Sequence, residues 1–405
     1  MGLGKKTIDD QNYCGKKVLV RCDFNVPMKD GVITNENRIN AALPTIQKLV
    51  NDGAKVILCS HLGKPKNGPE AKFSLAPVAV ALSAKLGKTV VFADDDNVVG
   101  ENAKAAVAAM NNGDVVLLQN TRFRKEETKN MPEFSEELAS LADAYVDDAF
   151  GSCHRAHCST AGVTDFIKDT AVGYLMEKEI KYLGNAVNDP ERPFTAILGG
   201  AKVSDAFQMM ETVLSRGVAD EILTGGLVAN IFLIARGQAI GSGSYDFIAA
   251  SNYTEYFDKA KALYAAYGDR IVLPVDLAWV RDGRREEAKI DRIPEEIGAV
   301  DVGAETASLY CERILRAKTA FVNGPMGVFE KPESELGTQV VWQALADTTA
   351  FTVLGGGDSI TATEKYGLTE KMGYICTGGG ALIRFLSGEE LPVVNALRHG
   401  STLPQ

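Results

Sequence analysis

Two kinds of hydrophobic pattern alternate along the chain. Short apolar runs, each about as long as a buried strand, are separated by longer segments in which apolar residues recur every three or four positions, as on one face of a helix. In the first half, the predicted strands are residues 17–21, 55–59, 89–92, 114–118 and 144–148, and the predicted helices run from about Arg38 to Gly53 and over 76–86, 102–111 and 134–143. Strands that alternate with helices through short connections predict a parallel sheet that is covered on both faces.

The same alternation starts again at Phe194. The predicted strands of this second series are residues 194–198, 221–223, 270–275, 319–322 and 350–354. Residues 161–193 are predicted to connect the two series, with a helix that starts near Met176 and ends before Pro190. A rigid helix between two sheets suits a hinge. The pattern therefore predicts two α/β domains, and the apolar tail 391–397 could dock back on the first of them.

Composition narrows the class of protein without changing this prediction. At 405 residues, and with roughly 100–200 residues per domain, the chain has room for two or three domains. A net charge of −10 argues against nonspecific nucleic-acid binding, and no segment approaches the ~18 apolar residues of a membrane span. The seven cysteines include no Cys-x-x-Cys pair, which suits reduced thiols and gives no zinc signature. The first residues are polar, so we expect no signal peptide and a cytoplasmic protein.

Side chains suited to a small anion follow the predicted strands of the first half. They are Arg21, Asp23, Asn25, Arg38, His61, Asn120, Arg122 and the segment 151–157, which holds His154, Arg155 and His157. The carboxyl ends of parallel strands share one edge of a sheet, and guanidinium groups match phosphate and carboxylate oxygens. Each basic residue alone could be a solvated surface group, but together they predict a cationic pocket for a small, multiply anionic ligand. We expect no metal between His154 and His157, because Arg155 would repel a cation.

The loops of the second half are rich in glycine instead. They are residues 199–202, 224–226, 323–327, 355–357 and 377–380. Glycine lets the backbone approach a ligand closely, so five such loops at strand ends predict a nucleotide site. Asp358 directly follows one of them, where its carboxylate could hold Mg²⁺ that bridges phosphates. The chain has no Gly-x-x-x-x-Gly-Lys-Ser/Thr, and no Gly-x-Gly-x-x-Gly between a strand and a helix, which disfavours P-loop and dinucleotide-binding proteins.

The stretch Leu198–Ala206 leads from a predicted strand through Gly199 and Gly200 into a predicted helix. The free N–H groups and the dipole of a helix start both favour a phosphate, and Lys202 adds a mobile positive charge there. Taken alone, this stretch could be an ordinary turn with a surface lysine.

Together, these motifs resemble the phosphoglycerate kinase family over essentially the whole chain. The matching segments, in the family's order and spacing, are residues 20–27, 60–65, 154–157, 199–205, 323–330, 355–358 and 377–380. The resemblance implies two Rossmann-like three-layer domains with parallel sheets, facing across a hinged cleft. It implies a phosphoglycerate-binding domain over 1–172 with the returning tail 392–405, and a nucleotide-binding domain over 173–391 that begins with an interdomain helix around 175–188. The implied reaction is reversible phosphoryl transfer between 1,3-bisphosphoglycerate and ADP, with Mg²⁺, in a cytoplasmic monomer.

The resemblance also implies roles for individual residues. Those expected to bind phosphoglycerate are Arg21, Asp23, Asn25, Arg38, His61, Arg122 and Arg155. Those expected to bind the nucleotide are Gly200, Ala201, Lys202, Gly225, Gly226, Asn323, Pro325, Glu330, Gly356, Gly357, Asp358 and Ser359, with Glu330 on the ribose and Asp358 on the metal. Those expected to take part in catalysis are Arg38, Lys202, Gly357 and Gly380. Phosphoryl transfer needs in-line placement and neutralised oxygens rather than an acid or base, so Asp23 is expected only to accept the substrate hydroxyl.

Three positions depart from the family pattern. The family usually has a second lysine four residues after Lys202, where this chain has Ala206. Its Gly-Gly-Gly-Met-Ala motif is replaced by residues 225–229, Gly-Gly-Leu-Val-Ala, and Lys64 stands in place of an arginine in the substrate loop. Besides a working kinase, the sequence therefore leaves open a catalytically weak protein that senses nucleotide or phosphoglycerate. A dehydrogenase is discounted, because the dinucleotide fingerprint is missing.

Overall fold

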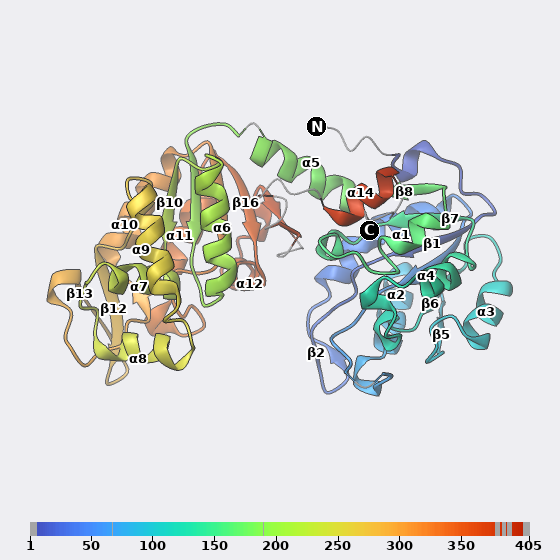
Figure 1. The fold of residues 1–405 in the computed structure, drawn as a ribbon, viewed down its shortest axis with the longest axis horizontal. Coiled ribbons are helices and arrows are strands. Elements are labelled where there is room, and N and C mark those ends of the chain that lie inside the picture. The colour runs from blue at the N-terminus through green and yellow to red at the C-terminus, as the bar shows by residue number, and fades with distance from the viewer. Residues whose placement is uncertain are drawn as a thin grey trace. The chain divides into compact units, whose positions relative to one another are not determined.

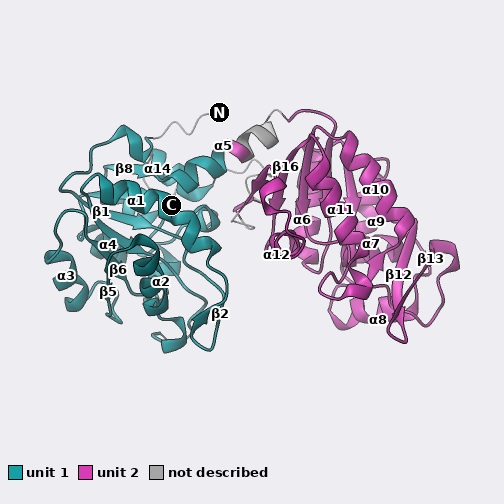
Figure 2. Cartoon of the chain, turned by 180° about the vertical axis from the view of Figure 1, so that it is seen from behind, with its two compact units in different colours: residues 1–181, 389–405 teal, residues 182–388 magenta. Residues whose placement is uncertain are grey.

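The computed structural model describes residues 6–66, 68–188, 190–376, 381, 382, 386 and 391–399, with the side chains of 183–188 left out. The chain forms two compact units, residues 1–181 with 389–405 (unit 1) and residues 182–388 (unit 2), as Figure 2 shows. The division falls inside helix α5 (Tyr174–Asn188), whereas the boundary predicted from the sequence lies just before it. No helix in the described ranges is long and apolar enough to cross a membrane.

Unit 1 is built on a six-stranded parallel sheet of strand order β5-β6-β4-β1-β7-β8 (Figure 1). Its strands are β1 (Lys17–Arg21), β4 (Lys55–Cys59), β5 (Val90–Ala93), β6 (Val115–Leu118), β7 (Ala144–Asp147) and β8 (Thr170–Val172). Its helices are α1 (Asn37–Asn51), α2 (Ala76–Leu86), α3 (Glu101–Ala108), α4 (Pro132–Ala139) and α14 (Pro392–His399), and a small hairpin is formed by β2 (Met28–Lys29) and β3 (Val32–Ile33). The apolar faces of α1 and α2 pack on β1 and β4, which builds the core that fixes the strand ends.

The C-terminal helix α14 belongs to unit 1. The backbone N–H of Val393 donates to the carbonyl of Cys153 at 3.3 Å, and Val393 is fully buried. The apolar tail therefore contacts the loop after β7, although the whole of unit 2, residues 182–388, separates them in sequence.

Unit 2 repeats the architecture with the strand order β11-β10-β9-β15-β16-β17, again all parallel. These strands are β9 (Phe194–Leu198), β10 (Glu221–Thr224), β11 (Ile271–Val272), β15 (Thr319–Asn323), β16 (Phe351–Gly355) and β17 (Tyr374–Ile375). Two groups of helices flank the sheet (Figure 1): α6 (Val203–Ser215), α7 (Gly226–Ala235), α8 (Ser242–Ala250) and α9 (Tyr256–Tyr267), and α10 (Ala304–Arg316), α11 (Leu336–Asp347) and α12 (Gly357–Lys365).

Three elements differ from the prediction. The segment 161–193 is more than a connector, because β8 within it pairs with β7 and extends the first sheet. The strand predicted over 270–275 pairs only over β11, since Pro274 has no N–H to continue a ladder. The sequence analysis also missed a three-stranded antiparallel sheet of β12 (Asp276–Arg281), β13 (Arg284–Lys289) and β14 (Asp301–Val302). The two-residue Asp282-Gly283 turn, with positive φ at both positions, was the signal for its hairpin.

Candidate active site

Arg21 ends β1 in unit 1 and is completely buried. Its Nε donates to Ser159 Oγ at 2.8 Å, and Ser159 Oγ in turn donates to the buried Glu127 carboxylate at 2.6 Å. Its Nη2 lies 3.1 Å from His61 Nδ1. Since all the guanidinium contacts are with protein, the structure makes Arg21 a positioning residue, and direct binding of substrate by Arg21 stays a prediction.

His61 follows β4 and is oriented by that contact. Burial, together with the positive charge of Arg21, lowers its pKa well below the usual value, so the ring is neutral. A guanidinium can only donate, so Nδ1 accepts and the proton sits on Nε2. His61 therefore offers an N–H donor to a ligand and carries no charge that changes near neutral pH.

Asp23 and Arg38 form an ion pair between the loop after β1 and the first turn of α1. Burial alone would raise the pKa of Asp23, but the positive charges of Arg38 and Arg21 outweigh it and hold the pKa below its usual range. The Asp23 carboxylate is therefore an acceptor rather than an acid at neutral pH, as expected for a group that binds a hydroxyl. Arg38 keeps a third of its side chain exposed and stays open to a ligand.

A chain of hydrogen bonds links Asn25 to Arg122. Asn25 Oδ1 accepts from the Gly63 N–H at 2.8 Å, and Arg122 Nη1 donates to the Gly63 carbonyl at 2.7 Å. Asn120, completely buried, accepts from the backbone N–H of Arg122 at 3.0 Å. Three of the predicted loops of unit 1 are thus held together by their own polar groups.

A cavity of about 500 Å³ opens beside this chain. It is lined by Lys64, Pro65, Lys66, Gly68, Arg122, Arg124, Lys125, Thr128, Lys129, Arg155 and His157. Of the predicted substrate residues, only Arg122 and Arg155 line it. Burial, followed by repulsion from the positive charges of Arg155 and Arg21, lowers the pKa of Arg122 to about 10. An anion of small size would relieve that repulsion.

Several lining residues were missed from the sequence. Lys66, Arg124, Lys125 and Lys129 stand close to predicted residues in the chain, and this spacing was the available signal. Arg124 is partly neutralised, because it pairs with Glu137 at 2.8 Å and with Glu126.

In unit 2, three glycine loops interlock at the ends of β9, β10 and β15. The Gly200 N–H donates to the Pro325 carbonyl at 2.8 Å, and the Gly226 N–H donates to the Met326 carbonyl at 2.8 Å. A Cβ on Gly324 would clash with the Gly199 carbonyl, and one on Gly226 would clash with Gly200. β9 and β15 are the neighbours where the strand order reverses, the place where parallel α/β sheets bind their ligands.

Lys202 lies beside these loops, at the residue that precedes α6. Its Nζ is 3.2 Å from Asp358 Oδ2, at the first turn of α12. The side chain of Lys202 is 59% exposed and that of Asp358 is 50% exposed. A small pocket joins them to Gly199, Gly200, Asn323, Gly356 and Ala206, and Lys202 is its one cation among the described residues.

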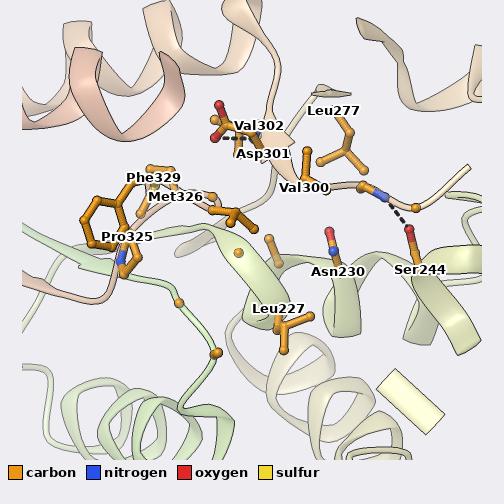
Figure 3. Close-up of a pocket in the computed structure, with 18 of the residues that line it drawn as sticks. Leu227, Asn230, Ser244, Leu277, Val300, Asp301, Val302, Pro325, Met326 and Phe329 are labelled. Carbon is orange, nitrogen blue, oxygen red and sulfur yellow. Dashed lines mark hydrogen bonds between the residues drawn. The ribbon is translucent and has the colours of Figure 1, made fainter. Parts of the chain in front are cut away.

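A larger cavity of about 410 Å³, drawn in Figure 3, adjoins this small pocket. The two share Gly200, Ala201 and Asp358 in their linings. Its walls are mainly apolar and come from α7, α8, β12, β14 and the loop after β15, which includes Pro325 and Glu330. A phosphate-sized polar site next to a deep apolar cavity matches the two ends of a nucleotide.

The comparisons with known proteins agree over the whole length. A family model described as phosphoglycerate kinase matches residues 8–389. A phosphoglycerate kinase of Clostridium perfringens is 53% identical over 400 residues, which cover 98% of this chain and 99% of that protein. The chain belongs to the phosphoglycerate kinase family.

Solved phosphoglycerate kinase structures share the fold. The crystal structure from Pyrococcus horikoshii has a TM-score of 0.89 at 38% identity and covers 97% of this chain and 98% of its own. That from Coxiella burnetii has a TM-score of 0.84 at 37% identity, with the same coverage. The expectation of two Rossmann-like α/β domains with parallel sheets is therefore confirmed.

The remaining predicted family residues fall into three groups. Ser359 is completely buried and its Oγ accepts from the Gly324 N–H at 2.8 Å, so it holds a glycine loop in place. Gly225 donates to the Leu198 carbonyl at 3.1 Å, and its neighbour Gly226 opens α7. Gly380, with the rest of the loop 377–380, lies outside the described residues.

Gly357 differs from the other glycines of this family site. It begins α12, its φ is ordinary, and a Cβ added there would meet no atom of the residues that the structure describes within 4 Å. Gly356, just before it, has φ +84° and would clash with the Asn323 side chain. Within the described part of the chain, the protein therefore requires glycine at position 356 but not at position 357.

Proposed function

We propose that the chain catalyses reversible phosphoryl transfer between 1,3-bisphosphoglycerate and ADP, giving 3-phosphoglycerate and ATP in glycolysis and gluconeogenesis. Its family membership makes it a kinase of glycolysis. The observation that carries the assignment is the pairing of Lys202 with Asp358 at 3.2 Å, where the glycine loops meet the apolar cavity. That arrangement supplies a mobile cation, a hard carboxylate and close backbone at one point.

The nucleotide would lie with its base and ribose in the 410 Å³ cavity and its phosphates over the small pocket. Ala201 and Pro325 line the cavity near its mouth, and Glu330, which is exposed there, would accept the ribose hydroxyls. The glycine loops after β9 and β16 would bring backbone N–H groups to the phosphates. Binding would replace the Lys202–Asp358 ion pair by contacts of each residue with the ligand.

The residues at this point fit Mg²⁺. Asp358 offers a half-exposed carboxylate, and no group of three or more His, Cys, Asp and Glu side chains suited to a metal exists in the described part of the chain. Mg²⁺ commonly binds through one or two carboxylates, substrate phosphates and water, so a site with one protein carboxylate suits it. Asp358 would hold the ion, which would neutralise phosphate charge when bound.

Phosphoglycerate would bind at the strand ends of unit 1. Arg38 and the basic cavity with Arg122 and Arg155 offer positive charge, His61 offers a neutral N–H, and Asp23 and Asn25 offer acceptors. Lys64 also lines the cavity; it keeps the positive charge of an arginine but not the two-pronged fork.

Phosphoryl transfer requires the two ligands to meet in line, with the charge on the transferring group neutralised. We propose that the units close about a hinge at α5, bringing Arg38 from unit 1 and Lys202 from unit 2 to that group. Closure would also exclude water, which otherwise hydrolyses an acyl phosphate. The protein would act as a monomer in the cytoplasm.

The direct test is ATP formation from ADP and 1,3-bisphosphoglycerate by the purified full chain, with and without Mg²⁺. We expect turnover that depends on Mg²⁺ and is abolished by a chelator. A folded sample that forms no ATP would overturn the proposal.

Ala206 favours a second candidate, a weakly catalytic sensor of nucleotide or phosphoglycerate. It lines the small pocket where the family usually has a lysine, and the described lining has no cation besides Lys202. Calorimetry on the same sample separates the two, since a sensor would bind both ligands normally without turnover.

A further inference from the structure

We propose that the side-chain amide of Asn230 binds the hydrogen-bonding edge of the nucleotide base and selects bases that place a donor beside an acceptor, as adenine does. This rests on the proposed nucleotide-binding role of the 410 Å³ cavity. It adds a residue that determines base specificity.

The buried polar side chains in the described lining of that cavity are Asn230, Ser244 and Asp301. Ser244 Oγ donates to the Ile240 carbonyl at 2.8 Å and accepts from the Ala299 N–H at 2.9 Å. The Asp301 carboxylate accepts from Arg285 at 2.9 Å, from the Gly337 N–H at 2.9 Å and from the Val302 N–H at 2.9 Å. Both of these groups therefore already have hydrogen-bond partners in the protein.

Asn230 is different. The residue is only 5% exposed, and its side chain makes no hydrogen bond with any residue of the described chain. Figure 3 shows the amide pointing from α7 into the cavity, on the side of Val300 and Ser244. The amide atoms of Asn230 are not among the fully buried side-chain atoms that lack a partner, so they stay open to the cavity. A ligand that fills the cavity would remove their water, and leaving them unpaired would then be unfavourable. A ligand that fills the cavity and carries a matching polar edge would supply the missing partners.

The position of Asn230 along α7 suits the base rather than the phosphates. Gly226 opens α7 beside Gly200, at the phosphate end, and also lines the cavity. Residues four apart lie on one face of a helix, so Asn230 stands about 6 Å further along the same face. The apolar walls around it, including Leu277 and Val300, would cover the flat faces of a base.

The chemistry of a carboxamide fits such an edge. Its oxygen accepts and its NH₂ donates, side by side, which matches the 6-amino group of adenine and the ring nitrogen next to it. Leucine has nearly the same shape without either function. An aspartate offers two acceptors, which match the N1–H and 2-amino donors of guanine instead.

The experiment measures affinities of ADP, of purine riboside 5′-diphosphate, which lacks the 6-amino group, and of GDP by calorimetry on the full chain. We expect the wild type to prefer ADP over the analogue about tenfold, the value of one good bidentate contact, and Asn230→Leu to lose most of this preference. We expect Asn230→Asp to raise the affinity for GDP relative to ADP about tenfold. Leu227→Ala is the matched control, because this apolar lining residue should weaken ADP and the analogue equally and leave their ratio unchanged.

Each result decides between the alternatives. An Asn230→Leu variant that binds both nucleotides with the wild-type ratio overturns the role of Asn230 while leaving the proposed function intact. An unchanged GDP-to-ADP ratio in Asn230→Asp, whose side chain has nearly the same shape, also overturns it. A wild type that fails to bind ADP at all overturns the proposed function as well. Unchanged affinity for 3-phosphoglycerate shows that each variant is folded.

Discussion

The two units have related sheets, and the edges proposed to bind anions are built by opposite means. In unit 2 the strand order, numbered along the unit, is 3-2-1-4-5-6, and in unit 1 the fourth strand is inserted to give 3-4-2-1-5-6. Both orders reverse next to the first strand of the unit, between β1 and β7 in unit 1 and between β9 and β15 in unit 2. Unit 1 places charged side chains at that edge, whereas unit 2 places glycine backbone there.

The difference has a physical cost on each side. A buried cation such as Arg21 must be compensated, and it is, through Ser159 and the Glu127 carboxylate. Glycine loops need no counter-charge, but they need close packing, as between Gly226 and Gly200. Unit 1 therefore fixes its site by polar networks, and unit 2 fixes its site by sterics. Substitutions that remove a charge or add a methyl group should separate the two.

The largest effect is expected from Arg38→Ala in unit 1. It removes a proposed donor to the transferring group and leaves the Asp23 carboxylate without its partner. We expect kcat to fall about 10³-fold, at the upper end for loss of one such donor, with ADP affinity unchanged. Steady-state kinetics beside calorimetry would show this, and Lys104→Ala on the surface of α3 serves as the control. A loss confined to KM would contradict a role in the transition state.

Lys202→Met tests the one described cation at the glycine edge. We expect kcat to fall about 10²-fold, while ADP affinity falls much less, because glycine N–H groups still hold the phosphates. The matched control is Lys261→Met, since the Lys261 side chain is 60% exposed and that of Lys202 is 59%. Equal losses of turnover and binding would mean that Lys202 only binds nucleotide.

Gly357→Ala asks whether unit 2 depends on backbone approach. The added methyl group meets no atom of the described residues within 4 Å, so we expect normal stability but about tenfold lower activity, through a clash with the bound nucleotide. Gly356→Ala is the contrasting variant and should lose stability, because it combines φ +84° with a clash against Asn323. Thermal denaturation and kinetics of both variants make the comparison, and full activity in Gly357→Ala would remove this loop from the proposed site.

The sequence was sufficient for the parts of this comparison that depend on pattern. Strand–helix alternation predicted both sheets, and the loops after the strands predicted most of the side chains and glycines at the two edges. The sequence could not distinguish Arg21, whose guanidinium contacts His61 and Ser159, from Arg38, whose side chain stays accessible to a ligand. That distinction depends on burial and on partners that lie 40 and 138 residues further along the chain.

Other features escaped because their signals are short or depend on tertiary structure. β8 has three residues, too few for a periodic pattern to show. The basic cavity gathers Lys66 and Lys129 from separate loops, and neither belongs to a motif. Asn230 looks like an ordinary polar residue in a helix until the cavity beside it is known.

A smaller effect, in the opposite direction, is expected from Ala206→Lys. Ala206 lies in the first turn of α6, four residues after Lys202, and lines the small pocket whose described cation is Lys202 alone. We expect kcat to rise a few-fold, roughly 3–10, because a second charge would help to neutralise the phosphates. An unchanged rate from an active wild type would show that another group already supplies that charge.

The smallest effect concerns stability and the buried carboxyl groups of unit 1. Asp148, after β7, is completely buried against Gly173, and its Oδ1 accepts from the Met176 N–H at 3.1 Å at the start of α5. Burial raises the pKa of Asp148 to about 7, whereas an unfolded aspartate titrates near ~3.9. The native state therefore holds a proton that the unfolded state releases, and stability should fall as pH rises between these values.

We expect the wild type to lose about 2 kcal/mol of unfolding free energy between pH 5 and pH 8 through Asp148, at up to ~1.4 kcal/mol per pH unit within the titrating range. Asp148→Asn should remove this part of the slope and leave the parts due to Asp147 and Asp301, whose pKa values burial also raises. Denaturant titrations at several pH values measure it. Asp143→Asn is the control, because this exposed carboxylate also accepts a backbone N–H, from Lys17 at 2.9 Å, and should keep the slope. An unaltered slope in Asp148→Asn would place the pH dependence outside this edge of unit 1. The energetic cost of burying an ionised carboxylate at this edge would then not distinguish it from the glycine edge of unit 2.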